Sequence, residues 1–403
     1  MHAVIVGNGI AGVTAARHVR KASAEARITM VSDEALEPYS RTALMYVYMG
    51  ALTQRHTWLY PERFWAENRI DRVRDRAVSL DASRQRVTLE GGALDYDRLL
   101  IATGSWPALP DWRGVGLPGV QGLYHLSDLE RMEASTRGIG RAVVVGGGLI
   151  GVELAEMLRT RGIGVTFLVR EPRYLGHAFT PAESALVEAE IRRHGVDLRL
   201  TTEVERIEGD GRAQAVVTTD GERVPAAFVG VGTGVRANTG WLGGAVETNR
   251  GVLVDRQLAA SAENVWAAGD CAELRDPPPG TRAVEPIWYS ARLQGATAGL
   301  AMAGHGRDYD PGVFFNSAKF FDLEWQTYGA ASAPGQDWQA SDGRRSLRIR
   351  HDGGRVLGVN SLGVRMRQDV CSRWVEEGWS LDRALADVGA AVFDPEFTRP
   401  LAV

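Results

Sequence analysis

The chain has 403 residues, which predicts two or three domains, and its composition of 44% hydrophobic and 24% charged residues is typical of a soluble globular protein. The formal net charge of -4 gives no basic surface for nucleic acid. No apolar run reaches the roughly 18 residues of a membrane helix, and no signal-peptide pattern opens the chain. We therefore expect a cytoplasmic protein without a membrane span.

The residues that most often bind metals or form redox pairs are sparse. Only two cysteines occur, Cys271 and Cys371, and they are too far apart in the sequence for a CxxC motif. The eight histidines show no HExxH or similar spacing. The sequence therefore predicts no metal site and no disulfide framework.

The first predicted element is a buried strand over 3–6, followed by a glycine-rich turn and a helix over 13–20. A second strand over 28–31 precedes an acidic residue. This is a βαβ unit with GxGxxG in its turn, which lets a pyrophosphate approach the helix N-terminus while the acidic residue accepts ribose hydroxyls. The predicted ligands are Gly7, Gly9, Ile10, Ala11, Gly12 and Asp33.

The same pattern occurs a second time, with a strand over 141–145, a helix over 152–161 and a further strand over 165–169. Two complete dinucleotide units in one chain are a much stronger signal than a single glycine motif. The predicted ligands in the second turn are Gly146, Gly148, Leu149, Ile150 and Gly151.

Two further strands end in short motifs, Ala102-Thr103-Gly104 and Gly269-Asp270. With these motifs the sequence resembles the FAD-dependent pyridine nucleotide reductases, flavoproteins with two dinucleotide-binding domains. The resemblance implies that Thr103 and Gly104 close one FAD-binding lobe. It also implies that Asp270, with Gly269 before it, binds the ribityl chain of the flavin.

The order of the motifs implies an α/β protein with two Rossmann-like domains and a C-terminal α/β domain. The FAD domain is expected at 1–108 and 236–308, and the NAD(P) domain is inserted at 109–235. Gly234 begins a segment similar to the return crossing of the family. The domain at 309–403 resembles one that often builds a dimer interface, so we expect a homodimer.

The segment Pro38-Tyr39-Ser40-Arg41 is similar to the ferredoxin reductase, rubredoxin reductase and apoptosis-inducing-factor branches of the family. The resemblance implies that Arg41 helps to hold FAD. In those branches a lysine near the flavin follows, but here that position is Tyr46. The glutamate that pairs with this lysine survives as Glu153, so the pair is incomplete.

A candidate replacement lies in the segment 319–323, which is similar to the KxFDL stretch of NADH oxidases and coenzyme A disulfide reductases. Of the 46 basic residues only Lys21 and Lys319 are lysine. We hypothesise that Lys319 approaches the flavin; the alternative is a structural ion pair with a nearby carboxylate.

Those oxidases and reductases carry a redox cysteine near the positions that here hold Thr42 and Ala43. Threonine and alanine cannot form the mixed disulfide or sulfenic acid that carries electrons through a thiol. Electrons are therefore expected to leave directly from the flavin. Trp288 precedes a helix that lies against the flavin in the family, so it is expected to border the acceptor face; ordinary aromatic packing is the alternative.

The choice of nicotinamide depends on the end of the second strand in the NAD(P) unit. By resemblance, the glutamate that binds the ribose in NAD enzymes is replaced by Val169, and Arg170 follows, as in NADPH-dependent relatives. Glu171 is close enough in sequence to serve a ribose instead. The prediction leans to NADPH, with NADH as the alternative.

These inferences predict an FAD-dependent NAD(P)H oxidoreductase in which Glu153, Lys319 and Tyr46 are the candidate catalytic residues. A ferredoxin-like or rubredoxin-like protein is the first choice of acceptor. One alternative is an oxidase or reductase of a small acceptor such as oxygen, a quinone or a metal chelate. Another is an NAD(P)H-sensing binding protein of the apoptosis-inducing-factor kind.

Overall fold

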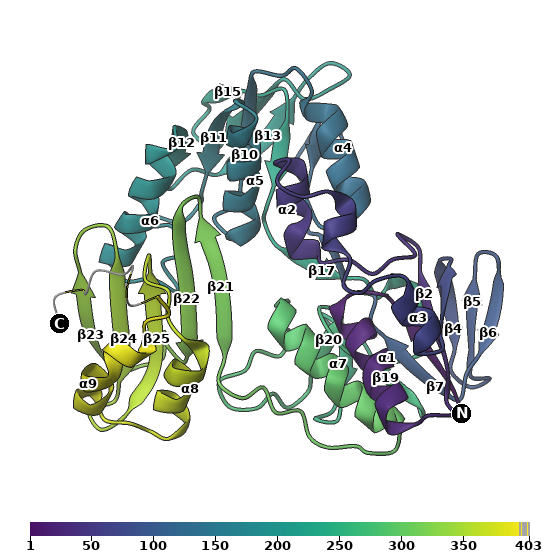
Figure 1. Ribbon diagram of the computed structural model, residues 1–403. Helices are drawn as coiled ribbons and strands as arrows, with labels where there is room; N and C mark the ends of the chain where they lie inside the picture. The colour runs from purple at the N-terminus through teal and green to yellow at the C-terminus, as the bar shows by residue number, and fades with distance from the viewer. Residues whose placement is uncertain (395, 397–400, 402–403) are drawn as a thin grey trace. The chain divides into compact units, whose positions relative to one another are not determined.

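The computed structural model describes residues 1–394, 396 and 401. The chain divides into two compact units (Figure 1). The first unit comprises Met1–Ala108, Tyr124–Glu130 and Val235–Pro311, and the second comprises Leu109–Leu123, Arg131–Gly234 and Gly312–Val403. The division into three domains, with boundaries at 108, 235 and 308, stays a prediction.

The first unit contains a five-stranded parallel sheet in the order β3-β2-β1-β7-β19. The four residues of β1 after His2 are all buried, as expected for a parallel strand covered on both faces. Helices α1 and α7 lie side by side along this sheet (Figure 1). These elements are β1 (His2–Val6), α1 (Ile10–Ala22), β2 (Arg27–Ser32), β3 (Ile70–Arg74), β7 (Arg98–Ile101), β19 (Val265–Ala267) and α7 (Trp288–Met302).

Shorter elements complete the first unit. An antiparallel sheet is inserted between β3 and β7, and the segment between β2 and β3 forms short helices. The antiparallel sheet is β4 (Ala77–Asp81), β5 (Arg86–Leu89) and β6 (Gly92–Asp95); the helices are η1 (Arg41–Ala43), α2 (Leu44–Tyr48), η2 (Gln54–Thr57) and α3 (Arg63–Glu67). Two small sheets have two strands each: β8 (Ser105–Pro107) pairs with β17 (Val235–Ala237), and β18 (Val252–Val254) pairs with β20 (Ala272–Leu274). A short helix, η3, spans Gly240–Leu242.

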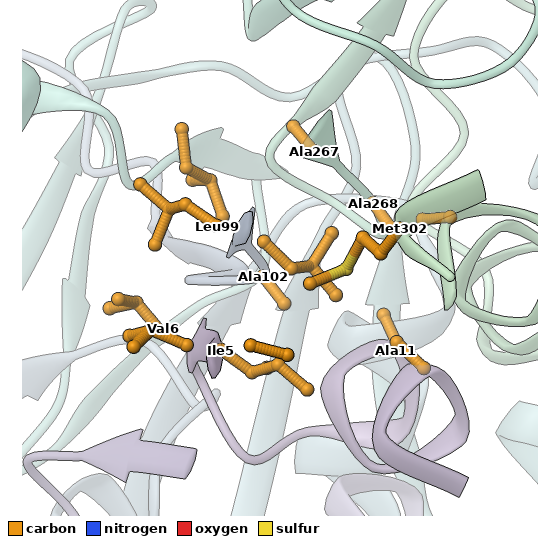
Figure 2. Close-up of a cluster of buried hydrophobic side chains, with 14 of the residues drawn as sticks. Ile5, Val6, Ala11, Leu99, Ala102, Ala267, Ala268 and Met302 are labelled. Atoms are coloured by element: carbon orange, nitrogen blue, oxygen red, sulfur yellow. The ribbon is translucent and has the colours of Figure 1, made fainter. Parts of the chain in front are cut away.

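Small and branched side chains fill the core of the first unit. Figure 2 shows Ile5 and Val6 from β1 with Leu99 from β7, Ala267 from β19 and Met302 from α7. All of these side chains are buried. Because all but Met302 come from β1, β7 and β19, which are adjacent strands of the sheet, the core fixes the ends of these three strands, where the glycine turn and the two short motifs lie.

The second unit repeats this sheet, in the order β12-β11-β10-β16-β9 with all strands parallel. Its own antiparallel insert, β13-β14-β15, precedes β16 as β4-β5-β6 precedes β7. The elements are β9 (Val120–Gln121), β10 (Arg141–Val145), α5 (Leu149–Thr160), β11 (Gly164–Leu168), α6 (Pro181–Arg193), β12 (Val196–Arg199), β13 (Val204–Glu208), β14 (Ala215–Thr218), β15 (Arg223–Pro225) and β16 (Val229–Val231). Helix α4 (Leu126–Thr136) belongs to the first unit up to Glu130 and to the second unit from Arg131.

A five-stranded antiparallel sheet near the C-terminus also belongs to the second unit, in the order β21-β22-β25-β24-β23. Helices α8 and α9 cover it around the buried Trp374, and β21 packs against α5 and α6 (Figure 1). The elements are β21 (Phe315–Phe320), β22 (Leu323–Gly329), β23 (Gln336–Ser341), β24 (Ser346–His351), β25 (Val356–Leu362), α8 (Gln368–Glu376) and α9 (Leu381–Ala391).

The predicted fold class, an α/β protein with two Rossmann-like units and further C-terminal α/β structure, is confirmed. The two helices after the glycine turns begin earlier than expected, at Ile10 and Leu149, because the third motif residue already caps each helix. Among the residues described, no helix has the length and apolar character needed to cross a membrane.

Candidate functional site

In the first glycine turn two glycines lie so close to backbone carbonyl groups that there is no room for a side chain. A Cβ on Gly7, where φ is 112°, would lie 2.0 Å from the carbonyl oxygen of Ala102. A Cβ on Gly12 would lie 2.0 Å from the carbonyl oxygen of Gly7. Both contacts are far inside van der Waals distance, so the turn can pack this tightly against β7 and α1 only with glycine at both positions.

The middle glycine of the same turn faces open space. A Cβ on Gly9 would meet nothing within 4 Å. Gly9 is the N-cap of α1 and provides no side-chain cap, so the first backbone N–H groups of the helix, at Ile10 and Ala11, lack intrahelical acceptors. This arrangement fits the pyrophosphate of a dinucleotide, which needs room and N–H donors at the helix N-terminus.

The second turn has the same construction. A Cβ on Gly146, where φ is 113°, would lie 2.4 Å from the carbonyl oxygen of Gly232, and one on Gly151 would lie 2.0 Å from that of Gly146. A Cβ on Gly148 would have its nearest neighbour at 3.8 Å. Gly148 caps α5 without a side-chain hydrogen bond, and Leu149 and Ile150 begin the helix. The second turn therefore also fits a pyrophosphate.

Two carboxylates follow β2. The predicted ligand, Asp33, is exposed and pairs with Arg76 at 3.1 Å. Glu34, which the sequence analysis did not single out, is more buried and pairs with Arg41 at 2.5 Å. Because Glu34 is next to Asp33 in the sequence, it could have been considered as a second candidate. Only the folded structure shows that Glu34 is the more buried of the two carboxylates.

Arg41 lies within a hydrogen-bonded cluster of the first unit. Its guanidinium donates to the hydroxyl of Tyr39 at 2.9 Å and to the carbonyl of Tyr124 at 3.1 Å, and it lies 4.7 Å from the centre of the Tyr124 ring. Burial disfavours its charge, but Tyr39 and Glu34 outweigh that effect and raise the pKa of Arg41. Burial likewise opposes the charge of Glu34, yet Arg41 holds the pKa of this carboxyl below its usual value. Both groups are therefore charged at neutral pH.

The same cluster reaches Asp270. The hydroxyl of Tyr124 donates to Oδ2 of Asp270 at 2.8 Å and accepts from the backbone N–H of Ser105 at 3.1 Å. Burial raises the pKa of the Asp270 carboxyl. Tyr124 thus connects Arg41 to Asp270, two residues that the sequence analysis assigned separately to FAD. It lies 146 positions from Asp270, and no local motif indicated it.

Thr103, Gly104 and Gly269 are the other predicted FAD ligands of the first unit. A Cβ on Gly104 would lie 2.7 Å from the hydroxyl of Tyr124, so a glycine makes room for the ring. Thr103 donates its hydroxyl to the carbonyl of Asn238 at 2.7 Å, and the N–H of Gly269 donates to Gln294 at 2.8 Å. Gly234, where φ is 111°, precedes β17.

Two aromatic candidates belong to the first unit. Trp288 is the first residue of α7, and its ring packs edge-on against Tyr289 with centroids 5.3 Å apart. Tyr46 lies on α2, is half-buried, and accepts backbone hydrogen bonds from Ala51 and Leu52 through its carbonyl. Their predicted roles beside the flavin stay predictions.

Glu153 and Lys319 belong to the second unit. Lys319 donates to Oε1 of Glu156 at 2.5 Å, which is the ion-pair alternative raised from the sequence. Glu153 lies on α5, where burial and the charge of Glu156 raise its pKa to about 7 although Lys319 opposes them. A contact of Lys319 with the flavin stays a prediction. Sequence reasoning missed Glu156, which follows Glu153 by one helical turn.

The end of β11 places two opposite charges together. Arg170 donates from Nε and Nη2 to Oε1 of Glu171, at 3.2 and 3.1 Å. The other carboxylate oxygen, Oε2, would lie 3.5 Å from a Cβ on Gly147. Glu171 therefore has one oxygen beside the second glycine turn, while the side chain of Arg170 is 73% exposed.

One group of metal-ligand atoms occurs among the described residues. Atoms of Glu190, His194 and Asp322 lie within 4.8 Å of one another. However, Nη2 of Arg193 lies 2.7 Å from Glu190 and 3.0 Å from Asp322. The guanidinium supplies the positive charge that this group needs, so we assign it to ion pairing and propose no metal there.

Neither cysteine is placed for redox exchange. Cys271 and Cys371 are both unpaired thiols with no exposed surface. Burial raises the pKa of each thiol, so the reactive thiolate is disfavoured at neutral pH. Sγ of Cys271 donates to the carbonyls of Ile101 and Ala268 within the core.

Comparison with known proteins agrees with this geometry. Residues 1–295 match the family described as pyridine nucleotide-disulphide oxidoreductase. The ferredoxin–NAD(+) reductase component of the biphenyl dioxygenase system from Paraburkholderia xenovorans is 31% identical over 98% of both chains. The epsilon subunit of an NADH-dependent phenylglyoxylate dehydrogenase from Aromatoleum evansii is 31% identical over 82% of this chain and 80% of its own length.

A solved structure gives the same result for the fold. A ferredoxin reductase from Rhodopseudomonas palustris superposes with a TM-score of 0.83 at 27% identity, over 90% of this chain and 91% of its own. The two glycine turns and the matched length together establish the class of the protein. This chain belongs to the pyridine nucleotide-disulphide oxidoreductase family and is an FAD-dependent NAD(P)H oxidoreductase.

Proposed function

We propose that this protein passes electrons from NADH through FAD to a small iron–sulfur or rubredoxin-type protein. FAD, when bound, accepts a hydride from the nicotinamide and gives up electrons to an acceptor. The single observation that carries the proposal is the burial of both cysteines, because it leaves no protein thiol to relay electrons onward. The biphenyl dioxygenase relative, whose name describes it as a ferredoxin–NAD(+) reductase component, also supports the proposal because it matches this chain over 98% of both lengths.

The residues of the first unit are proposed to bind and orient FAD. Gly9 leaves room for the pyrophosphate at the start of α1. Arg41 is the permanent positive charge of the cluster, and Asp270 supplies a buried acceptor that Tyr124 holds in place. In the second unit Glu153 is proposed to orient the nicotinamide or to tune the charge near it, rather than to act as an obligatory base.

The donor is proposed to be NADH, although the sequence leans to NADPH through Arg170. Glu171 supports NADH because one of its carboxylate oxygens lies beside the second glycine turn, where a ribose with two hydroxyl groups needs an acceptor. The same carboxylate pairs with Arg170 and would repel a 2′-phosphate.

The substitution Glu171→Gln tests this assignment because it removes the charge and keeps the shape. A hydrogen bond to a charged group contributes about 1.5–3 kcal/mol, so NADH affinity should fall about tenfold or more while NADPH affinity rises or stays level. Calorimetric titration with NAD+ and NADP+ measures this difference, because the oxidised cofactors carry the same ribose groups as NADH and NADPH and do not reduce the flavin. Arg170→Ala is the control and should leave NADH binding nearly unchanged; a loss of NADPH turnover alone in that variant would assign the donor to NADPH instead.

Anaerobic rapid mixing tests the whole reaction. The FAD-loaded protein is mixed with NADH or NADPH, the flavin absorbance is followed, and a [2Fe–2S] ferredoxin or a rubredoxin is then added. Rapid reduction by NADH followed by reduction of one of these proteins is the expected result. If neither protein is reduced, and oxygen or a quinone added in a separate mixing experiment takes up the electrons, the protein is a reductase of small acceptors. If neither nicotinamide reduces the flavin, the sensing alternative replaces the proposal.

Two finer expectations stay predictions. The homodimer was expected from the resemblance of the C-terminal region, and light scattering of the FAD-loaded protein measures its mass directly. The cytoplasmic location was expected from the sequence and requires fractionation of cells that produce the protein.

A further inference from the structure

The C-terminal sheet places a lysine against the helix that follows the second glycine turn. Strand β21 packs on α5, and Nζ of Lys319 lies 2.5 Å from Oε1 of Glu156. The two residues are 163 positions apart, so only the tertiary structure brings them together. The Glu156 side chain is 8% exposed and that of Lys319 is 28% exposed. Water screens this pair less than a surface pair, so each charge acts more strongly on its neighbours.

Glu156 is only half satisfied by this contact. Its second oxygen, Oε2, is buried and has no hydrogen-bond partner among the described residues. An unpaired buried carboxylate oxygen is costly, so the ion pair with Lys319 is the contact that stabilises this side chain.

Glu153 is the ionisable residue one turn earlier on the same helix face, where residues three positions apart are neighbours. Burial and Glu156 oppose its ionisation, and Lys319 favours it. Tyr174 is close enough to Glu153 for their charges to interact, and its hydroxyl donates to the carbonyl of Gly148 at 3.0 Å. The strands that pack on α5 add no further charge near it: β11 and β16 contain no ionisable residue, and β10 has only Arg141 at its first position.

We propose that Lys319 is a positioning residue that acts through Glu156. By holding the Glu156 carboxylate in place, it controls whether Glu153 binds a proton. Lys319 would thus serve the nicotinamide-binding unit without touching a cofactor. This differs from the contact with the flavin that the sequence suggested.

The consequence for the reaction rests on the proposed function, which puts Glu153 near the nicotinamide. An oxidised nicotinamide ring carries a positive charge that the reduced ring lacks. Ionised Glu153 would therefore favour the oxidised cofactor, and protonated Glu153 would not. NAD+ should bind more tightly as the pH rises through the titration of Glu153.

The direct test is an infrared titration of carboxyl protonation in the FAD-loaded protein, from about pH 5 to about pH 9, a range that brackets a carboxyl titrating near neutrality. The difference from Glu153→Gln isolates the relevant band. In Lys319→Met the first proton of the Glu153–Glu156 pair should bind about one pH unit higher or more, because an opposite charge is lost. In Glu156→Gln the proton on Glu153 should bind at lower pH, because a like charge is lost.

Lys319→Arg retains the positive charge and should restore the wild-type titration, which a purely structural role would not require. An unchanged titration in Lys319→Met, or shifts of the same sign in Lys319→Met and Glu156→Gln, would overturn the proposal. If Lys319→Met fails to fold, the near-isosteric Glu156→Gln and the charge-conserving Lys319→Arg still decide it.

A calorimetric titration with NAD+ separates this inference from the proposed function. The midpoint of its pH dependence should move upward in Lys319→Met together with the infrared titration. If the infrared shifts occur and NAD+ binding has no pH dependence, the control by Lys319 stands and the place of Glu153 beside the nicotinamide is wrong.

Discussion

The two glycine turns have nearly the same backbone but different surroundings. In both, the first glycine has φ near 112° and the last leaves no space for a Cβ beside the carbonyl oxygen of the first. The second position differs: Asn8 donates to the carbonyl of Ala35 at 2.7 Å, whereas a Cβ on Gly147 would lie 2.7 Å from the side chain of Val169. The backbone therefore provides a pyrophosphate site twice, and the neighbouring side chains distinguish the two cofactors.

The charged groups around the two turns are arranged differently. In the first unit the hydroxyl of Tyr39 links Glu34 to Arg41, and Tyr124 links Arg41 to Asp270 through its backbone carbonyl and its hydroxyl. In the second unit Glu153 and Glu156 lie on α5 within the βαβ element, and the positive charge that pairs with Glu156 comes from outside it, since Lys319 belongs to the C-terminal sheet.

The largest expected effect comes from the link between the C-terminal sheet and helix α6 within the second unit. Arg348 is 2% exposed and pairs at 3.1 Å with Glu183, which is fully buried. Glu183 also accepts from Asn360 at 2.8 Å. Removing one partner of a buried pair costs about 3–5 kcal/mol, so Arg348→Ala should lower the free energy of unfolding by that amount in denaturant titrations.

The matched control is Arg345→Ala, because Arg345 pairs with Asp342 at 2.7 Å near the surface of the same sheet. Its cost should stay at about 1 kcal/mol or less. An equal decrease in the free energy of unfolding in both variants would mean that the buried pair contributes no more to stability than the pair near the surface.

The next effect separates the two turns directly. Gly9→Ala and Gly148→Ala add a methyl group where the fold has space, and both positions have backbone angles that alanine adopts. Stability should therefore change by only about 1 kcal/mol or less. Gly9→Ala should lose FAD affinity, and Gly148→Ala should lose NAD+ affinity, each about tenfold or more, because the methyl group occupies the approach of the pyrophosphate.

Flavin content after gel filtration and calorimetry with NAD+ measure the two losses. Each variant serves as the control for the other. Loss of both cofactors in a single variant would show that the turns are not independent sites.

The smallest effect concerns the tyrosine that joins the charges of the first unit. Tyr124→Phe removes the hydroxyl that donates to Asp270. A hydrogen bond contributes about 1 kcal/mol, so FAD affinity should weaken about fivefold in a fluorescence titration. Tyr96→Phe is the control, since the Tyr96 hydroxyl is buried without a hydrogen-bond partner among the described residues. If Tyr124→Phe binds FAD with wild-type affinity, the hydrogen bond from Tyr124 to Asp270 does not contribute to FAD binding.

The sequence by itself determined the two dinucleotide units, because their glycines are local requirements of a turn that a few adjacent residues specify. It also indicated Arg41, Glu153 and Asp270 through short motifs. Only the tertiary structure decided which groups these residues meet. Tyr124 reaches Asp270 across 146 positions and Lys319 reaches Glu156 across 163, and such contacts depend on how separate strands and helices pack. No periodicity or spacing encodes them, since burial and the charge of distant neighbours exist only once the chain is folded.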